Sequence, residues 1–247
     1  MPTTTLKVYL SAGHGVYFDP ILKKWVSQRR SYWGVVEDFW TVLLARELFV
    51  LLDEDKRFQV FMNRDFFNEE IGESGFQKWM QGSHLFFQEV GAPEWVWSVG
   101  SGIVQVMNAD ANGIIYHDAN LVLGLHANCD DGQSRGYEIW HHSAANLGKK
   151  LSLQLAESLQ ELPTVNRGVY CDRWHDARPV WRLAQGRVMA VINYFFYDHP
   201  LDNEQMKQQK NITLAAQLTY QGIDKFIEIY GHQIPKRERS WQTKMQE

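Results

Sequence analysis

The chain has 247 residues, of which 45% are hydrophobic and 22% charged, so it can build one globular domain with a core, and its composition excludes a disordered or coiled-coil protein. The formal net charge is −4, from 25 basic and 29 acidic residues, which gives no electrostatic basis for binding nucleic acid or an anionic membrane. Two cysteines, Cys129 and Cys171, allow at most one disulfide and are consistent with a reducing compartment.

The first predicted element is a short strand that begins near Leu6 and ends in the turn Gly13-His14-Gly15. Val8 and Leu10 are its apolar residues, and the two glycines free the backbone on either side of one imidazole. Open α/β sheets bind ligands at the C-terminal ends of their strands. His14 is therefore the first candidate site residue.

Residues 16–34 show no clear period and are rich in Arg, Lys, Tyr and Trp. We expect an excursion over the sheet edge that borders the site, because long loops at strand ends usually carry function. Arg29 or Arg30 is placed to meet a substrate carboxylate, and Arg29 is our candidate.

Apolar residues at helical spacing over residues 35–53 predict the first long helix. Glu37 lies in its first turn, where the helix dipole favours a carboxylate, so taken alone it is a structural acid. Residues 58–62 alternate weakly and predict a second strand, and this strand-helix-strand order favours a parallel sheet. A helix is expected over residues 75–90.

Residues 91–118 contain two apolar runs separated by turn signals at Gly100-Ser101-Gly102 and again over residues 108–113. We expect an irregular or hairpin insertion near the cleft rather than a second domain.

Residues 121–125 form a continuous apolar run, which is typical of a central parallel strand and ends at His126. Residues 136–140 predict a further short strand that carries Glu138. Ser143 is expected to cap a helix that continues to residue 162. His141 and His142 face opposite sides of a strand, so we interpret them as surface residues.

Residues 166–170 predict a short extended piece, residues 188–196 a buried last strand, and residues 202–230 a long helix closed by Gly231. We predict an α/β fold built as a single three-layer domain over residues 1–247, with helices on both faces of a mostly parallel, twisted sheet. Insertions are expected at about residues 16–34 and 91–118, and a C-terminal tail at 232–247.

His14, Glu37 and His126 come from three separate elements, and two imidazoles with one carboxylate form a common zinc-ligand set of hydrolytic enzymes. Such a set leaves one coordination position open for water. Cys129 is close enough to His126 to be a rival ligand, although a small buried thiol is the simpler interpretation. Each histidine needs an acceptor for its other ring N–H, and we expect Asn128 or Asp38 to supply it.

The order of these elements resembles that of the zinc-dependent N-acetylmuramoyl-L-alanine amidases of the type 3 family, the cell-wall hydrolases of bacteria and phage lysins. The likeness covers roughly residues 6–230. It rests on five motifs in family order: Ser11-Ala12-Gly13-His14-Gly15, Val36-Glu37-Asp38, Gly124-Leu125-His126-Ala127-Asn128, Gly136-Tyr137-Glu138 and Asn166-Arg167-Gly168.

This resemblance implies a monomeric, endolysin-like hydrolase that uses zinc to cleave the amide bond between N-acetylmuramic acid and L-alanine. Its partner would be peptidoglycan or a muropeptide. In that interpretation Asn128, Arg167 and Arg29 contact the substrate.

One position departs from the family pattern. The family carries a general-base Glu on its last strand, and aligning Phe196 and Pro200 places Asn193 there. An amide cannot take a proton from water at neutral pH. The register cannot simply be shifted, because no Glu lies between Glu161 and Glu204.

Two hypotheses follow for the missing base. The first is an active hydrolase whose base is another group, with Glu138 the best carboxylate and His175 or His199 the imidazole candidates. The second is a catalytically impaired pseudoamidase that binds zinc and muropeptide as a binding or regulatory protein. We favour the first, because the proposed ligand set is intact.

Residues 1–5 have neither the charged nor the apolar region of an export signal, and no apolar run approaches the roughly 18 residues of a membrane span. We therefore expect the protein to be cytoplasmic as synthesised, with release to the cell wall by another route as the alternative.

Overall fold

The structure, a computed structural model, describes residues 5–19, 21–64, 82–98, 100–172 and 183–235, without the side chains of residues 172, 184 and 185. The strands are β1 (Leu6–Ala12), β2 (Val16–Asp19), β3 (Lys24–Ser27), β4 (Phe58–Met62), β5 (Leu121–Asn128), β6 (Tyr137–His142), β7 (Asn166–Asp172) and β8 (Val188–Phe196). The α-helices are α1 (Glu37–Asp53), α3 (Ser83–Glu89), α4 (Glu94–Trp97), α5 (Gly102–Tyr116), α6 (Asn146–Ser158), α8 (Pro200–Met206) and α9 (Gln209–Tyr230).

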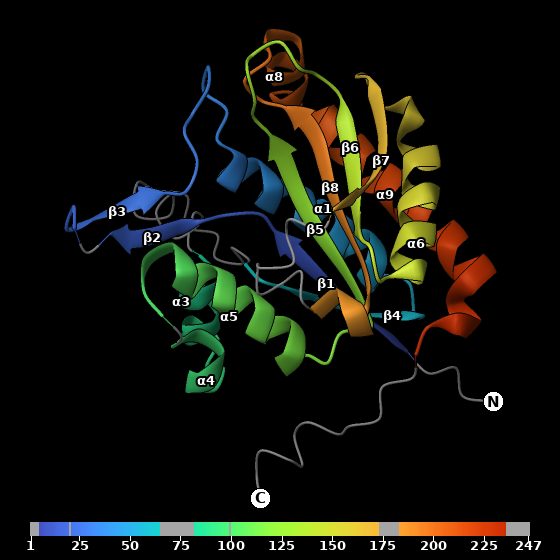
Figure 1. Ribbon diagram of the computed structural model, residues 1–247, viewed down its shortest axis with the longest axis horizontal. Coiled ribbons are helices and arrows are strands. Elements are labelled where there is room, and N and C mark those ends of the chain that lie inside the picture. Colours follow the sequence, from blue (N-terminus) through green and yellow to red (C-terminus); the bar gives the residue numbers. More distant parts are fainter. Residues whose placement is uncertain (1–4, 20, 65–81, 99, 173–182, 236–247) are drawn as a thin grey trace, which may run out of the picture.

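The main sheet has the strand order β4-β1-β5-β8-β6-β7 (Figure 1). Strands β4, β1, β5 and β8 are parallel to one another, whereas β6 pairs antiparallel with β8 and parallel with β7. The C-terminal ends of β1, β5 and β8 therefore lie at one edge of the sheet. This mostly parallel arrangement confirms the predicted fold class.

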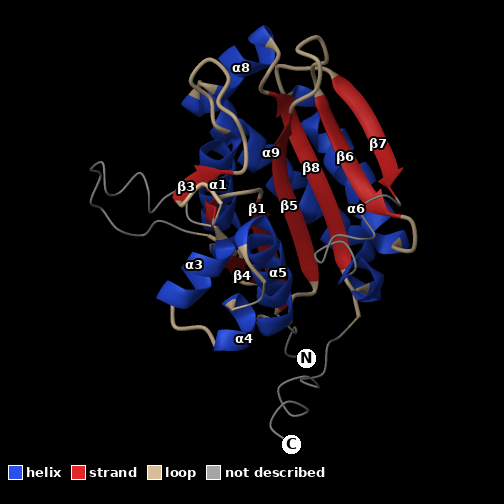
Figure 2. Cartoon of the chain, turned by 60° about the vertical axis from the view of Figure 1, so that its left-hand side comes forward, coloured by secondary structure: helices blue, strands red, loops and turns tan. Residues whose placement is uncertain are grey.

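Helices cover both faces of the sheet (Figure 2). On one face, α1, α6 and α9 enclose a core that includes Leu10, Leu44, Leu123 and Phe226. On the other face, α3, α4 and α5 pack over a smaller core that includes Tyr9, Phe87, Ile114, Val122 and Met189. Successive strand residues point to opposite faces, so Tyr9 and Leu10 belong to different cores.

The prediction of an irregular or hairpin insertion over residues 91–118 was wrong, because this segment forms the helices α4 and α5. Glycines 100 and 102 have φ angles of 84° and 57°, and α5 begins at Gly102, so the glycine turn leads into a helix instead of joining two strands. The residues that α5 buries include Val106, Ala109, Gly113 and Ile114, which is helical spacing. The β-branched residues at the start of α5 obscured this period.

Residues 16–34, expected as an irregular excursion, contain the two-stranded hairpin of β2 and β3. Of the helix expected over residues 75–90, α3 forms the part from 83 to 89, and residues 75–81 lie outside the described ranges. No helix in those ranges is both long and apolar enough to cross a membrane.

Three smaller expectations need correction. The helix α6 begins at Asn146 with Ala145 at its N-cap, so Ser143 does not cap it. The helix expected over residues 202–230 is two helices, α8 and α9. His141 and His142 are buried rather than at the surface, at 7% and 3% exposure, because β6 lies between β7 and β8.

We predict that Gly113→Ala destabilises the protein by about 1–3 kcal/mol, the usual cost of overpacking a core. A Cβ at this position of α5 would lie 2.2 Å from the ring of Phe87 and 2.5 Å from the hydroxyl of Tyr9. Urea unfolding followed by circular dichroism measures the change. Val104→Ala, at a half-exposed position of the same helix, is the control and should change the free energy of unfolding by less than about 0.5 kcal/mol. Equal stabilities of the two variants would contradict this packing of α5.

Candidate metal centre

His14, Glu37 and His126 meet at the C-terminal edge of the sheet, as the sequence predicted. His14 follows β1, Glu37 opens α1, and His126 lies near the end of β5. Nε2 of His14 is 3.2 Å from Oε1 of Glu37 and 3.3 Å from Nδ1 of His126, which is itself 3.4 Å from Oε1 of Glu37. The three ligand atoms thus form a nearly equilateral triangle.

This triangle fits a tetrahedral metal ion. When ligand atoms lie about 2.0–2.1 Å from such an ion, as histidine and carboxylate ligands do around zinc, they are separated by about 3.3 Å. The three distances here are 3.2, 3.3 and 3.4 Å. Among the described residues, these are the ones whose ligand atoms gather closely enough to hold a metal ion.

Gly13 allows the turn after β1 to approach β5 closely. Its backbone N–H donates to the carbonyl of Leu125 at 2.8 Å, and a Cβ at position 13 would lie 2.4 Å from Nδ1 of His126. Any side chain here would displace the His126 ring. His14 itself has a φ of 66°, a backbone conformation that is uncommon outside glycine and often found at functional sites.

Buried polar contacts stabilise the turn that carries Gly13 and His14. Nη2 of Arg64 donates to the carbonyls of Ala12 and Gly13 at 3.2 and 2.7 Å, and the Thr41 hydroxyl also donates to the Gly13 carbonyl. Arg64 is only 2% exposed. No sequence pattern singles out Arg64, because a charged residue after a strand is usually solvated.

Glu37 is 1% exposed, and its Oε1 also accepts the backbone N–H of Ala127 at 2.9 Å. Burial alone would raise the pKa of this carboxyl, but the charges and hydrogen bonds of His14 and His126 outweigh burial and hold the pKa well below its usual range. Burial lowers the pKa of His126, which keeps its imidazole neutral at pH 7. Both residues therefore have the protonation state that a metal ligand requires.

The expected acceptors for the ligand histidines were wrong in the case of His14. Its Nδ1 lies 3.0 Å from Oε1 of Gln28, which follows β3. Asp38 instead accepts the backbone N–H of Gly15, before β2, and the hydroxyl of Ser27, at the end of β3. It therefore links both ends of this hairpin, the hairpin base, to α1. Gln28 could not be identified from the sequence, because it lies 14 residues after His14 and only the pairing of β2 with β3 brings the two residues together.

Cys129 is not a rival ligand. It lies outside the metal-binding group, and its half-buried thiol interacts with Tyr32. Cys129 and Cys171 are both free thiols.

Arg29 lies at the metal centre, at the base of the hairpin. Its Nε is 3.1 Å from Nε2 of His14 and 3.5 Å from Oε2 of Glu37, and its side chain is 44% exposed. Nε2 has one lone pair, so it cannot accept from Arg29 and bind a metal ion together. Metal binding would therefore end the contact of Arg29 with His14 and leave its ion pair with Glu37.

A second polar group surrounds Glu138 on β6. Its Oε1 accepts from Nε of Arg167 at 2.6 Å, and its Oε2 accepts from Nε1 of Trp140 at 3.2 Å and more weakly from Nδ2 of Asn128 at 3.4 Å. Asn193 on β8 is directly paired with His126 on one side and with Glu138 on the other. Paired residues share a sheet face, so these three side chains lie in one row across β5, β8 and β6.

His199 and His175 were the alternative candidates for the base. His199 precedes α8 and is not among the residues that line the cavity described below. His175 lies outside the described residues.

A cavity of about 470 Å³ opens beside the metal centre. Its described lining includes His14, His126 and Asn193 at the sheet edge, Gln28 and Arg29 from the hairpin base, and Met107 and Asp110 from α5. Asp110 is the one acidic side chain among the described lining residues, and no local sequence pattern predicts its place there.

Asp110 is 9% exposed and accepts hydrogen bonds from the hydroxyls of Ser11 at 2.6 Å and Tyr9 at 3.0 Å. Burial raises its pKa from an ordinary 3.8 to about 6, although these hydrogen bonds and the charge of Arg64 oppose the rise. Ser11 pairs with Gly124, two residues before His126 on β5. Asp110 thus lies beside β1 at a level two residues before His126 along the neighbouring strand β5.

Known structures share this fold. An N-acetylmuramoyl-L-alanine amidase from Clostridium difficile 630 is 15% identical, with a TM-score of 0.61 over 91% of this chain and 97% of that one. The catalytic domain of CwlV, an N-acetylmuramoyl-L-alanine amidase from Bacillus (Paenibacillus) polymyxa var. colistinus, is 13% identical, with a TM-score of 0.60 over 91% and 99%.

The catalytic domain of an endolysin that targets Clostridia difficile is 16% identical, with a TM-score of 0.54 over 89% of this chain and 97% of that one. No protein-family model matches the sequence, and no curated protein matches it significantly. The chain therefore has the fold of N-acetylmuramoyl-L-alanine amidase catalytic domains, and it combines that fold with two histidines and one glutamate whose ligand atoms lie close enough together to hold a metal ion.

We predict that His14→Ala, Glu37→Gln and His126→Ala each weaken Zn²⁺ binding by more than about a hundredfold, whereas Gln28→Ala weakens it by about 10–100-fold. The ligand variants each remove one corner of the triangle, and the Gln28 variant removes only the partner of Nδ1 of His14. Titration against a zinc indicator measures both effects. His232→Ala, at an exposed position after α9, should bind as wild type does. Equal affinity of all five proteins would contradict the assignment.

The raised pKa of Asp110 predicts a pH-dependent stability. The folded chain keeps the Asp110 proton to higher pH than the unfolded chain, so this group stabilises the fold below about pH 4 and loses that contribution as the pH rises to about 6. The stability difference between wild type and Asp110→Asn should shift by up to ~3 kcal/mol between these limits. Urea unfolding across this range measures it, with the exposed Glu89→Gln as control. A difference that stays constant with pH would contradict the predicted titration.

Proposed function

We propose that the protein is a zinc-dependent amidase that hydrolyses the bond between N-acetylmuramic acid and L-alanine in peptidoglycan or a muropeptide. The observation that carries this proposal is the triangle of His14, Glu37 and His126 at the strand ends of an amidase fold. Among common metal sites, two histidines and one carboxylate with an open position are typical of hydrolytic zinc.

When bound, zinc would acidify a water molecule and polarise the carbonyl of the scissile amide. His14 and His126 would hold it through Nε2 and Nδ1, and Glu37 through its carboxylate. Gln28 orients the His14 ring by its contact with Nδ1. The cavity beside these residues would admit the amide together with part of the stem peptide.

Glu138 is our candidate for the group that accepts the proton of the attacking water. In our alignment with the resembled family, Asn193 stands where that family has its base, and Glu138 is the direct partner of Asn193 on the next strand. The Glu138 carboxylate reaches across β8 as far as Asn128 on β5, at 3.4 Å. The Glu138 carboxylate on β6 is thus part of the same row of side chains as His126.

Arg29 and Arg167 are our candidates for contacts with substrate carboxylates, and Asn128 for a contact with a substrate amide. Arg29 stands at the cavity lining and is released from His14 when a metal binds. Arg167 is already paired with Glu138. A substrate carboxylate that draws Arg167 away would free Glu138 to take a proton.

The alternative is a protein that binds zinc and muropeptide without cleaving it. Two observations favour it: an amide, Asn193, lies at the cavity lining, and Glu138 is already held by Arg167, Trp140 and Asn128. The two functions differ in product formation rather than in metal content.

We expect wild-type protein loaded with one zinc to release stem peptides from muropeptides, and Glu138→Gln to lower kcat by about 10²–10⁴-fold while it keeps zinc. Chromatography of digested muropeptides measures product, and metal analysis measures zinc. The exposed Glu228→Gln is the matched control and should cleave as wild type does.

The variant Asn193→Glu separates the two functions. If wild type holds zinc and cleaves nothing while Asn193→Glu releases stem peptides, the natural protein is a binding protein. If Glu138→Gln cleaves at the wild-type rate, another group is the base. Failure to bind zinc under metal-replete conditions would overturn both functions.

A further inference from the structure

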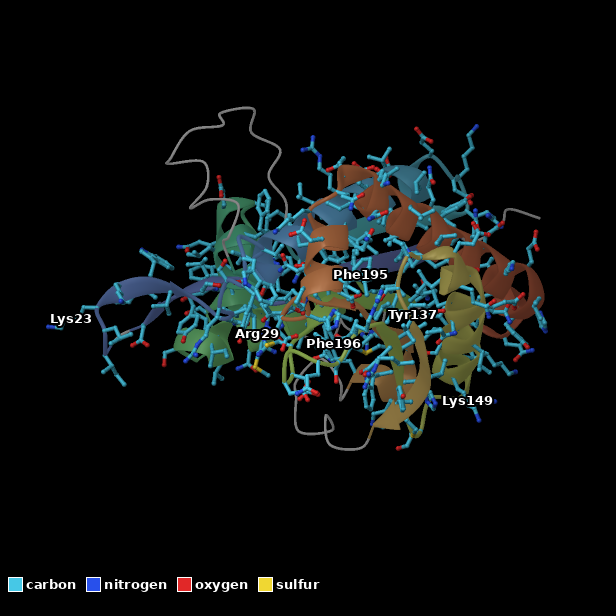
Figure 3. The ribbon with its side chains drawn as sticks, turned by 90° about the horizontal axis from the view of Figure 1, so that it is seen from above. Lys23, Arg29, Tyr137, Lys149, Phe195 and Phe196 are labelled. Atoms are coloured by element: carbon cyan, nitrogen blue, oxygen red, sulfur yellow. The ribbon has the colours of Figure 1, made fainter. Side chains whose placement is uncertain are left out.

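The hairpin of β2 and β3 projects from the body of the molecule (Figure 1). Its strands pair antiparallel from Val16 opposite Ser27 to Asp19 opposite Lys24. Figure 3 shows Lys23 at the far end of this projection and Arg29 at its base, against the body. A ribbon of four residues per strand extends about 13 Å.

The far end of the hairpin exposes large apolar side chains. Phe18 is 44% exposed, Ile21 88%, Leu22 57% and Trp25 50%, and we call these four residues the hairpin tip. Phe18 and Trp25 form a cross-strand pair with ring centroids 5.6 Å apart. Single exposed apolar residues are common, but a contiguous group at the end of a projection marks an interaction site.

The charges beside the hairpin tip are positive. Lys23 and Lys24 are both exposed at the turn. Among the described residues, the carboxylate at this turn is that of Asp19, which accepts the backbone N–H groups of Ile21 and Leu22 at 2.8 and 3.0 Å and so stabilises the turn itself. The chain as a whole has a net charge of −4, so the hairpin tip is a local reversal of the overall charge.

The hairpin is anchored in this projecting orientation. The face that carries Tyr17 packs against the start of α5 near Gly102, and the carbonyl of Val16 accepts the backbone N–H of Gly82 at 3.0 Å. Ser27 and Gln28 tie its base to Asp38 and His14. The opposite face, with Phe18 and Trp25, stays exposed.

We propose that the hairpin tip inserts into the headgroup region of an anionic phospholipid bilayer. Ile21 and Leu22 would enter the boundary with the acyl chains, and the rings of Phe18 and Trp25 would lie at the headgroup level that aromatic residues prefer. The two lysine ammonium groups would contact lipid phosphates. Binding by one small apolar patch and two charges is weak and reversible.

The size and shape of the hairpin tip favour a lipid surface over a protein partner. A stable protein interface uses about 20–30 residues on each side, and here four apolar residues stand at the end of a two-stranded ribbon. A narrow apolar projection flanked by lysines suits a soft, negatively charged surface, because the acyl boundary surrounds the projection on all sides.

Co-sedimentation of the full chain with vesicles tests this inference, which is independent of catalysis. We expect binding to phosphatidylcholine vesicles with about 30 mol % phosphatidylglycerol, at least tenfold weaker binding to pure phosphatidylcholine, and release in about 0.5 M NaCl. The double variants Ile21→Ser/Leu22→Ser and Lys23→Glu/Lys24→Glu should each weaken binding by at least about tenfold.

Matched variants away from the hairpin control for lost apolar surface and charge. Leu201→Ser/Ile229→Ser removes two half-exposed apolar side chains, and Lys149→Glu/Lys210→Glu reverses two exposed charges. Lys149 lies at the end of the molecule opposite Lys23 (Figure 3). Both control proteins should bind vesicles as wild type does.

Four results would overturn the proposal. The first is no sedimentation with anionic vesicles, and the second is binding that both hairpin variants retain. The third is self-association in analytical ultracentrifugation that Ile21→Ser/Leu22→Ser abolishes while vesicle binding is absent, which would make the hairpin tip an interface between copies of this chain. The fourth is vesicle binding that soluble polyphosphate competes away and that depends on Lys23 and Lys24 but not on Ile21 and Leu22. Such binding would be electrostatic, without insertion of the apolar side chains.

Discussion

The buried carboxylate of Glu37 is the constraint on which the rest of the site depends. A carboxylate that is 1% exposed is costly unless partners compensate its charge. Here both imidazoles and the Ala127 N–H approach the same oxygen, Oε1. These contacts require the end of β1, the end of β5 and the start of α1 to lie within a few ångströms, and Gly13 permits that approach because it has no Cβ.

The same constraint explains the buried cation beneath the site. Arg64 lies near the charges of Asp38, Asp110 and Glu37, and burial lowers its pKa to about 10 while those acids act in the opposite direction. It therefore remains charged at neutral pH. Its guanidinium also binds the carbonyls at the end of β1, so one side chain fixes the turn that presents His14 and offsets the negative charge around it. A divalent ion above the triangle would add to this compensation from the other side.

The sequence was sufficient for the parts of the molecule that follow general rules. Apolar runs that end at a histidine, in parallel strands, placed His14 and His126 at one edge, and the first turn of α1 brought Glu37 to them. The helix α5 was missed because its first turn is rich in β-branched residues and follows a glycine turn, both of which are typical of a hairpin. Gln28 and Asp110 were missed because they depend on tertiary contacts that no local pattern encodes: a hairpin returning to His14, and a helix packed over Ser11.

The β2–β3 hairpin and α5, whose secondary structure was not predicted, decide what kind of site the strand ends form. In an open α/β sheet the crevice at the strand ends faces solvent. Here the hairpin base contributes Gln28 and Arg29, and α5 contributes Met107 and Asp110, so the metal centre borders a walled cavity of about 470 Å³. That volume is typical of sites for small ligands. A polymeric ligand would have to present a narrow segment to this cavity rather than lie flat against it. Two oppositely charged side chains line the cavity, the Arg29 guanidinium beside the metal ligands and the Asp110 carboxyl beside Ser11. A segment that enters with a carboxylate toward Arg29 and hydrogen-bond donors toward Asp110 would match this polarity, and the opposite orientation would place like charges together.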